Sequence, residues 1–486
     1  MSKNPDSDSL SFAPTCLLLP GGNFRTSGES GLELMAGRVY TSGNRDGMDC
    51  PERTEEDARM RICHFEDHGV LDLEPLTLTR PVFDLYCGLT TLSAKQSRYF
   101  APCSAGILVR PFLADLIRQQ RLEEPINDPF WMQAGPVILV NGRWLPPADS
   151  RGLEIARSSP RVGLVNGEVA FAVLNPDQTD GLASVNLHEC LNSWKRSLPD
   201  CDAGGRLVER PWDLVRFNGD EILNDFRSRH TPSNCRPLDV SLIGPAGQLS
   251  IDRTARLDPL VVADTRNGPV VIDRDAVVGA FTRLEGPCYV GPGTQVFGAK
   301  VRAGTTIGPY CRIGGEIESS IIQGFTNKYH DGFIGHSYVG EWVNIGAGAQ
   351  FSDLRHDYGE IILTQDGLSI PSGMNKVGSF VGDHAKIGIG SLLNTGTIIG
   401  PFASLLPAGR LLPKSVPSFC HVSRGDIVDN HDCESLFATA REVMRRRGVE
   451  LIDEQLQVYR RVYEQTAVQR LQTLREVERK AARKSA

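Results

Sequence analysis

The sequence contains no long apolar run and no excess of positive charge. No hydrophobic stretch approaches the roughly 20 residues of a membrane-spanning helix, and the segment CLLLP at 16–20 has neither the basic start nor the length of a signal peptide. The net charge of −7 argues against a nucleic-acid-binding surface. We therefore expect a cytoplasmic protein that binds neither nucleic acid nor membrane.

The spacings that would indicate disulfides or a metal site are also missing. The chain has 12 cysteines, but none of them forms a CxxC pair or a metal-like cluster. Scattered cysteines of this kind are typically reduced and mostly buried in a cytoplasmic protein. We expect no structural metal.

Residues 1–59 show no sustained hydrophobic periodicity. They are rich in Ser, Gly, Asp, Glu and Arg, which is a composition typical of disorder. The pattern of a folded chain begins at Met60, which we interpret as the natural start or as the first residue after a dispensable tail. The sequence therefore predicts a disordered extension over 1–59.

Aliphatic residues recur every six positions in the second half of the chain, often followed by glycine. Neither the 3.6-residue period of a helix nor the two-residue period of a strand explains this spacing. Each six-residue unit can form one short strand and one corner, so that three units close a triangular coil. The main run is Val381, Ile387, Leu393, Ile399, Leu405 and Leu411, and an earlier run is Ile272, Val278, Leu284, Val290 and Val296.

Coils of this kind stack into a parallel β-helix, in which each aliphatic residue lies above its counterpart eighteen positions earlier. The spacing alone leaves the hand of the helix open. We place the β-helix at 239–425, with a mixed α/β domain before it at 60–238 and C-terminal helices after it at 426–486. Apolar residues at spacings of mostly three and four between Leu451 and Leu474 predict one long amphipathic helix in the last part.

The α/β domain is predicted from shorter patterns. Apolar runs at 106–109 and 136–140 are typical of buried strands, and the pair Asn166-Gly167 is suited to a type I′ hairpin turn. Helical patterns follow at 185–198 and 212–226.

The six-residue period fails twice, between Ile313 and Ile334 and again from Phe351 to Lys376. A stacked coil accommodates extra residues only by extruding them at a corner, so we predict that both segments are loops standing off the prism. Loops on a rigid scaffold commonly carry the chemistry of a protein. The first loop holds Asn327, Lys328, His330 and Asp331, and the repeat beyond it supplies His336, Glu341 and Asn344.

Runs such as IGPYCR, VGEWVN and VGDHAK resemble the hexapeptide-repeat acyltransferases, whose β-helix is left-handed. The segment HDGFIGHSYVGEWVNIGAG is similar to the acetyltransferase part of the bifunctional enzymes that make UDP-N-acetylglucosamine. There a histidine stands fourteen residues before the Asn of an N-I-G-A-G motif, and His330 and Asn344 match this spacing. The resemblance implies that His330 is the general base for attack of a sugar amine on acetyl-CoA, that Asn344 holds the substrate, and that the protein is a homotrimer.

A histidine suits this role because its pKa of roughly 6.5 lets it accept a proton at neutral pH. The alternative that His330 only hydrogen-bonds its own loop stays open, and His336 inside a repeat is likewise open to a structural role. The remaining candidates for substrate contacts are Asn327, Lys328, Asp331 and His336, with Asp353 and Arg355 as contacts to a sugar phosphate.

The segment LEPLTLTRPVFDLYCGLTTLSAK at 73–95 resembles the sugar-1-phosphate nucleotidyltransferases. Asp72 stands where that family has a phosphate-binding arginine, and Val82 stands where it has a lysine. Arg80, Asp84 and Lys95 are the candidate nucleotide-binding residues in their place, with Mg²⁺ as cofactor if the domain is active. With its P-L-T-x-x-R-P and N-K-x-H-D-G-F signatures, the chain is identified as a member of a GlmU-like sugar nucleotidyltransferase family.

These features predict a transferase of nucleotide-sugar biosynthesis that acetylates an amino-sugar phosphate, with nucleotidyl transfer to a sugar-1-phosphate as a further activity to be tested. Its partners are then a sugar phosphate and a nucleotide. One alternative keeps nucleotidyl transfer alone and makes the β-helix a scaffold for the trimer. The other is a non-catalytic trimer that binds sugar nucleotides or serves a structural purpose.

Overall fold

The computed structural model describes residues 61–485, apart from 103, 150, 229–239, 366, 408, 424 and 430–431. The predictions made for residues 1–59 and for Met60 lie outside this part of the chain. Within it, no helix is both long and apolar enough to cross a membrane.

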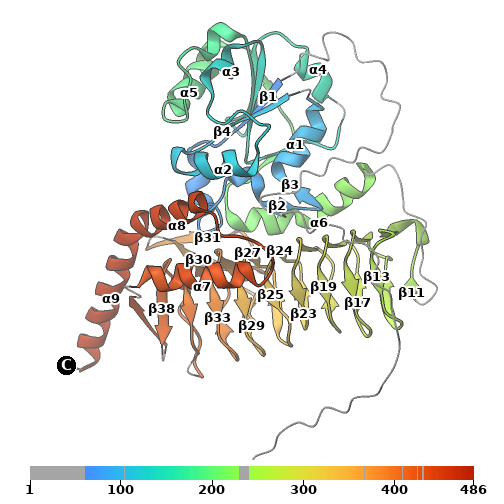
Figure 1. Cartoon of the computed structure of the whole chain (residues 1–486), viewed down its shortest axis with the longest axis vertical. Coiled ribbons are helices and arrows are strands. Elements are labelled where there is room, and N and C mark those ends of the chain that lie inside the picture. The colour runs from blue at the N-terminus through green and yellow to red at the C-terminus, as the bar shows by residue number, and fades with distance from the viewer. Residues whose placement is uncertain are drawn as a thin grey trace, which may run out of the picture. The chain divides into compact units, whose positions relative to one another are not determined.

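The first part of the described chain is an α/β domain built on a six-stranded sheet of order β4-β1-β5-β8-β7-β9 (Figure 1). β1 runs parallel to β4 and β5, whereas β8 runs antiparallel to β5 and β7. The strands are β1 (Arg61–Phe65), β2 (Tyr86–Cys87), β3 (Thr90–Thr91), β4 (Ser104–Leu108), β5 (Val137–Asn141), β6 (Trp144–Leu145), β7 (Arg161–Val165), β8 (Glu168–Leu174), β9 (Asp200–Asp202) and β10 (Arg206–Leu207). The helices are α1 (Leu92–Phe100), α2 (Ala114–Gln120), α3 (Pro129–Gln133), α4 (Gly152–Ala156), α5 (Leu187–Ser197) and α6 (Pro211–Ser228).

The predicted elements of this domain are confirmed. β4 and β5 cover the two apolar runs, and α5 and α6 cover the two helical patterns. The turn between β7 and β8 is Asn166-Gly167, with φ of 51° and 83°, which are the positive angles that a type I′ turn requires at both central positions. The hairpin turn was therefore readable from the sequence.

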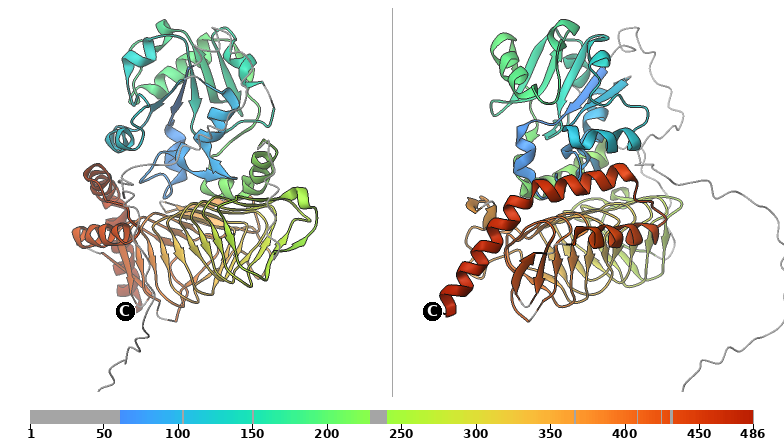
Figure 2. Two further views of the ribbon diagram at one scale, coloured as in Figure 1. Left: turned by 45° about the vertical axis from the view of Figure 1, so that its right-hand side comes forward. Right: turned by 60° about the vertical axis from the view of Figure 1, so that its left-hand side comes forward.

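The second part is a parallel β-helix with three faces, whose rungs follow one another from β11 to β38 (Figures 1 and 2). Face 1 contains β11 (Val240–Ile243), β14 (Val261–Asp264), β17 (Arg283–Glu285), β20 (Lys300–Val301), β23 (Glu316–Glu318), β26 (Phe333–Gly335), β29 (Gln350–Phe351) and β34 (Leu392–Leu393). Face 2 contains β12 (Leu249–Ile251), β15 (Val270–Ile272), β18 (Cys288–Val290), β21 (Thr305–Ile307), β24 (Ile321–Gly324), β27 (Tyr338–Glu341), β32 (Phe380–Val381), β35 (Ile398–Ile399) and β37 (Ser415–Val416). Face 3 contains β13 (Arg256–Leu257), β16 (Val277–Val278), β19 (Gln295–Val296), β22 (Arg312–Ile313), β25 (Asn327–Lys328), β28 (Asn344–Ile345), β33 (Lys386–Ile387), β36 (Ser404–Leu405), β38 (Cys420–Ser423) and the antiparallel β39 (Asp426–Asp429).

The strand register confirms the predicted fold class of an α/β domain, a parallel β-helix and C-terminal helices. Val277 pairs with Gln295, and Phe380 pairs with Ile398, in each case eighteen positions later. The predicted aliphatic residues point inward and are buried, with one exception. Leu412 is 4% exposed and Leu411 is 60% exposed, so the inward position has slipped by one residue at that coil. The left-handed sense stays the prediction that the resemblance makes.

The first interruption is not a protruding loop, and that prediction was wrong. Residues 321–335 form β24, β25 and β26, which continue all three faces. Arg312 pairs with Asn327, only fifteen positions later, so this coil has lost residues instead of gaining them. The inward residues Ile317, Ile322 and Ile334 are buried, at spacings that a strict six-residue period does not recognise.

The second interruption is an insertion, as predicted. Asn344 pairs with Lys386, forty-two positions later, and the extra residues leave the prism between β29 and β32. They contain a hairpin of β30 (Ile362–Gln365) and β31 (Leu368–Pro371). Ile361 and Leu363 of this hairpin arm are buried in a hydrophobic cluster with residues of the α/β domain.

The C-terminal helices pack on an aromatic stack at the corner between faces 2 and 3. The prediction of one long helix was wrong, because the chain forms α7 (Cys433–Arg445), α8 (Asp453–Gln465) and α9 (Ala467–Ser485), with the last two separated at Thr466. On the stack, the His384 ring lies 4.8 Å from the Phe402 ring, and its Nε2 is 2.9 Å from the Tyr459 hydroxyl of α8. The stacked residues are Tyr310, Phe325, Trp342, His384, Phe402 and Phe419.

Candidate functional site

His330 lies at the corner between faces 3 and 1, which we call corner 3–1. It follows β25 and precedes β26, and its side chain is exposed. The Tyr329 ring meets the imidazole edge to face, with the ring centroids 5.1 Å apart. The predicted base is therefore accessible to a substrate, although it stands on a shortened coil and not on a loop.

Polar side chains continue from His330 along the outer side of face 3. Asn327 and Asn344 pair on neighbouring coils, and the Asn327 Nδ2 donates to the Asn344 Oδ1 at 2.9 Å. The two asparagines that the motif singled out are thus brought together beside the histidine.

Two cations that the sequence analysis missed stand on either side of the asparagine pair. In the strand register, Arg312 lies next to Asn327 on the preceding coil, and Lys386 lies next to Asn344 on the following coil. Lys386 Nζ donates to the backbone carbonyl of Trp342 at 2.9 Å, so its ammonium is turned toward the corner between faces 2 and 3, and burial lowers its pKa to about 8. The row Arg312, Asn327, Asn344 and Lys386 offers amide and cationic groups, the chemistry that anionic phosphates and sugar hydroxyls require.

Lys328 does not face the solvent, and its prediction as a substrate contact was wrong. Its side chain points into the prism and is 0% exposed. The Nζ donates to the backbone carbonyl of Gly314 at 3.1 Å and to that of His330. Since inward and outward side chains alternate along a strand, Asn327 points out and Lys328 points in.

Burial of Lys328 makes a testable link between pH and stability. Burial lowers the pKa of Lys328 to about 8, and the nearby Asp331 opposes this shift. An unfolded lysine has a pKa of roughly 10.4. Between about pH 8 and 10 the unfolded state therefore binds more protons than the folded state, and folding stability rises with pH.

We expect the melting temperature of the wild-type protein to rise, relative to that of Lys328→Met, as the pH increases from 8 to 10. Below about pH 8 both states of the wild-type lysine are protonated, so the difference between the two proteins should be constant there. Calorimetry on both proteins across this range makes the measurement. Parallel curves throughout would show that Lys328 titrates normally.

His336 lies at a different corner, between faces 1 and 2. Its Nδ1 is 2.7 Å from Asp353 Oδ2, and Asp353 is the second residue after β29, at the start of the insertion. This pair fixes the start of the insertion to the corner. The end of the insertion is fixed there as well, since Gly378 donates its N–H to the His336 carbonyl at 2.9 Å. These contacts pair His336 with Asp353 within the chain and place both residues on another corner from His330.

The remaining predicted substrate residues are exposed. Asp331 lies beside His330 at corner 3–1. Arg355 lies in the insertion, where its Nε donates to Asp357 at 2.7 Å. The structure thus gathers His330, Asp331, Asn327 and Asn344, and it separates them from His336, Asp353 and Arg355.

The three predicted nucleotide-binding residues have their charges paired inside the chain. Arg80 donates to Asp383 at 2.5 Å and pairs with Glu341 at 2.9 Å, and both carboxylates belong to the β-helix. Lys95 is buried and pairs with Glu221 at 2.9 Å and with Asp225, while Asp84 pairs with Arg121. Their positions therefore do not support a contact with a nucleotide, because each group already serves an ion pair.

The α/β domain has a cavity of about 460 Å³ just beyond the carboxyl end of β1. Arg143, on its wall, donates to both oxygens of Asp67, at 2.7 and 2.5 Å, and Arg210 pairs with Asp72 at 2.8 Å. No three His, Cys, Asp or Glu side chains in the described ranges gather as a metal site. Because Asp67 and Asp72 are engaged by arginines, these residues do not fit a Mg²⁺ site.

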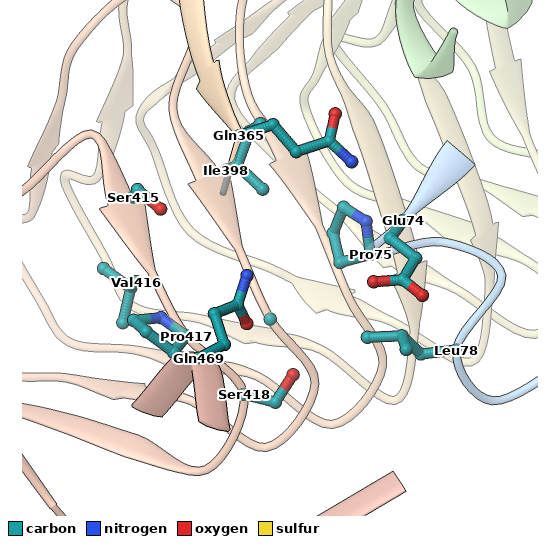
Figure 3. A pocket seen from close by; sticks show the side chains of 11 residues that line it. Glu74, Pro75, Leu78, Gln365, Ile398, Ser415, Val416, Pro417, Ser418 and Gln469 are labelled. Atoms are coloured by element: carbon teal, nitrogen blue, oxygen red, sulfur yellow. The ribbon is translucent and has the colours of Figure 1, made fainter. Parts of the chain in front are cut away.

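A second, much smaller cavity of about 30 Å³ is shown in Figure 3. Glu74, Pro75 and Leu78 line one side of it, and Gln365 of the arm and the residues around Ser418 line the other. Its size corresponds to about one water molecule. It is too small for a sugar phosphate.

The comparisons with known proteins match parts of the chain. Residues 62–231 match the family model described as "Sugar nucleotidyl transferase". A "Bifunctional sugar-1-phosphate nucleotidylyltransferase/acetyltransferase" of Sulfurisphaera tokodaii is 34% identical over 152 residues, which cover 29% of this chain and 36% of that protein. A "Bifunctional protein GlmU" of Heliobacterium modesticaldum is 32% identical over 161 residues, which cover 32% of this chain and 34% of the relative.

A solved structure described as a hexapeptide transferase family protein from Anaplasma phagocytophilum covers 42% of this chain and 92% of its own, at 17% identity and a TM-score of 0.18. At that score the likeness carries no argument, and the β-helix follows from the strand register alone.

The chain thus combines an α/β domain that is similar to the sugar nucleotidyl transferases with a β-helix of six-residue repeats. The chain is related to the GlmU-type bifunctional proteins at modest identity, and it spans about a third of the length of the curated relatives it matches, 36% and 34% for the two named above.

Proposed function

We propose that the protein is an acetyltransferase that transfers the acetyl group of acetyl-CoA to the amine of an amino-sugar phosphate at corner 3–1. The observation that carries this proposal is the exposed His330 beside the Asn327–Asn344 pair, with a cation on either side of that pair. The name of the Sulfurisphaera tokodaii relative, which includes acetyltransferase, supports the same proposal.

In this reaction the amine nitrogen attacks the thioester carbonyl, and His330 takes the proton that the nitrogen loses. The tetrahedral intermediate then collapses, the C–S bond breaks, and the imidazolium returns the proton to the leaving thiolate. The products are an acetamide and free CoA. General base catalysis of this kind contributes roughly 10²–10⁴-fold. Asn344 orients sugar hydroxyls, and Arg312 and Lys386 attract the phosphates of either substrate.

We further propose that the protein acts as a homotrimer in the cytoplasm, and that the copies meet along corner 3–1. Large apolar side chains are exposed along this corner, which is unfavourable in a monomer when they form a continuous row. Because His330 stands in the same row, a neighbouring copy would complete the acetyl-CoA site. The exposed apolar residues of the corner are Leu260, Phe281, Tyr329, Ile389 and Leu406.

We expect Ile389→Glu to break the trimer and to abolish acetyl transfer, because a charge would be buried at the centre of the contact. Sedimentation velocity gives the mass of the particle. Leu122→Glu, at an exposed position of the α/β domain, is the matched control and should leave a trimer. A trimer that survives Ile389→Glu places the contact elsewhere.

Nucleotidyl transfer to a sugar-1-phosphate is a second candidate function, favoured by the family match at 62–231. The 460 Å³ cavity lies at the carboxyl end of β1, where ligands of open α/β sheets bind. Release of pyrophosphate from UTP or dTTP with a sugar-1-phosphate and Mg²⁺ tests it. Pyrophosphate release would establish this activity, and its absence under these conditions would rule it out.

Radiolabelled acetyl-CoA with glucosamine-1-phosphate and related amines tests the main proposal. We expect labelled acetamide and an equal amount of free thiol. The absence of transfer to any amine would rule out the acetyltransferase, and nucleotide binding in the same preparation would then favour a non-catalytic role.

A further inference from the structure

Lys328 occupies a position that the rest of the β-helix gives to aliphatic residues. It lies on face 3 and points inward, directly between Ile313 and Ile345 on the neighbouring coils. A lysine here replaces apolar contacts with a charge that must be desolvated, which is costly. Seven aliphatic residues that occupy the same inward position on other coils of face 3 are buried: Val278, Val296, Ile313, Ile345, Ile387, Leu405 and Val422.

The Lys328 ammonium lies between two successive coils whose turns at corner 3–1 differ in length. The lower corner consists only of Gly314 and Gly315 between β22 and β23, whereas the upper corner runs from Tyr329 to Gly332 between β25 and β26. Lys328 Nζ donates to the Gly314 carbonyl below at 3.1 Å and to the His330 carbonyl above. A Cβ on Gly315, whose φ is +73°, would lie 2.9 Å from this Nζ, so glycine leaves the room it needs.

We propose that Lys328 is a positioning residue for acetyl transfer, whose buried ammonium holds the His330 backbone and thereby aims the imidazole from inside the prism. This inference depends on the proposed role of His330 as the base. Lys328 touches no substrate, because its side chain is fully enclosed. The exposed corner from Tyr329 to Gly332 is held by this contact and by two backbone hydrogen bonds, from the N–H of Gly348 to the Asp331 carbonyl at 2.8 Å and from the N–H of Glu316 to the Gly332 carbonyl at 2.9 Å.

A lysine kept for positioning should be dispensable for folding. Methionine at 328 restores an apolar column, and replacement of a buried charge by an apolar residue of similar volume is often neutral or stabilising. The same change removes the hydrogen bond to the His330 carbonyl. Activity and stability should therefore respond in opposite directions, which a purely structural lysine would not produce.

The experiment compares the full-length wild-type protein with Lys328→Met and with Ile313→Met, which is the matched control one coil away in the same column. The measurements are kcat and KM for acetyl transfer to glucosamine-1-phosphate, the melting temperature, and hydrogen exchange of backbone amides at 329–333. For Lys328→Met we expect kcat to fall roughly 10²-fold, since misplacement of a catalytic group by about 1 Å costs that much. We expect KM to stay unchanged, the melting temperature to stay the same or rise, and hydrogen exchange at 329–333 to become faster.

The double variant Lys328→Met/His330→Ala separates an effect through His330 from any other effect. If Lys328 acts through the imidazole, the double variant is no slower than His330→Ala alone. A further loss in the double variant would overturn the proposal, as would an unchanged kcat, or a loss of activity that follows a matching fall in melting temperature.

Hydrogen exchange tests whether Lys328 holds the corner even if the protein has no acetyltransferase activity. If the wild-type protein transfers no acetyl group, the acetyltransferase proposal fails, and faster exchange in Lys328→Met would still establish that Lys328 holds the corner. Unchanged exchange at 329–333 overturns the positioning role whatever the activity.

Discussion

Replacement of His330 by alanine is expected to lower kcat for acetyl transfer by roughly 10²–10⁴-fold, which is the usual contribution of a general base. The melting temperature should stay unchanged, because the side chain is exposed and its ring contacts the ring of Tyr329 at the surface. The measurement is the release of free CoA thiol at saturating amine, with the melting temperature taken on the same preparation.

His336→Ala is the matched control for this prediction. His336 is also a histidine at a β-helix corner, but it faces Asp353 and the arm. We expect its loss to reduce stability, and we expect the effect on kcat to stay well below the roughly 10²-fold that loss of a base produces. If His336→Ala abolishes transfer and His330→Ala does not, the base is the imidazole of the His336–Asp353 pair.

Arg80→Met is expected to destabilise the protein by about 3–5 kcal/mol, because it leaves buried carboxylates without their cation. The Arg80 side chain is 12% exposed and that of Asp383 is 7% exposed, so water cannot readily replace the guanidinium. Thr79 Oγ1 also donates to Asp383 at 2.5 Å, and the segment around Arg80 is thereby fastened to the β-helix. Urea unfolding followed by circular dichroism gives the free energy.

Arg445→Met provides the comparison for an exposed ion pair. Arg445 and Glu442 lie one turn apart on α7, and their side chains are 72% and 52% exposed. Such pairs contribute up to about 1 kcal/mol. Equal decreases in the free energy of unfolding for the two variants would show that the Arg80 ion pairs are not buried in solution. Arg80 would then again be a candidate ligand for a nucleotide.

The fold could be predicted from the sequence where the pattern is strictly local. The six-residue aliphatic repeat gave the β-helix, and Asn166-Gly167 gave a hairpin, because each depends on neighbours only a few positions away. The short coil was misread for the same reason. Its inward residues include Lys328, a charged residue at an aliphatic position, and its coil length of fifteen breaks the period.

The candidate site was only half visible in the sequence. The motif supplied His330 and Asn344, whose spacing of fourteen residues is a local signal. Arg312 and Lys386 adjoin the asparagines only through register, which depends on the short coil before Asn327 and on the insertion after Asn344.

The ion pairs that engage the predicted nucleotide-binding residues could not be predicted, because the partners of these residues are distant in sequence. Arg80 meets Asp383, a carboxylate about three hundred positions away, and Lys95 meets Glu221 and Asp225 of α6. A basic residue near a nucleotidyltransferase-like motif can contact a phosphate only if it does not form an ion pair with a carboxylate of the folded chain. A local sequence pattern does not reveal a partner that is distant in sequence.

A crystal structure with CoA and the amine acceptor bound is the most direct test of the central claim. Our account predicts that the sulfur lies in a groove at corner 3–1, with the acceptor amine within hydrogen-bonding distance of the His330 imidazole and its sugar beside Asn344. A thioester site at the His336 corner, or on any surface remote from His330, would contradict it.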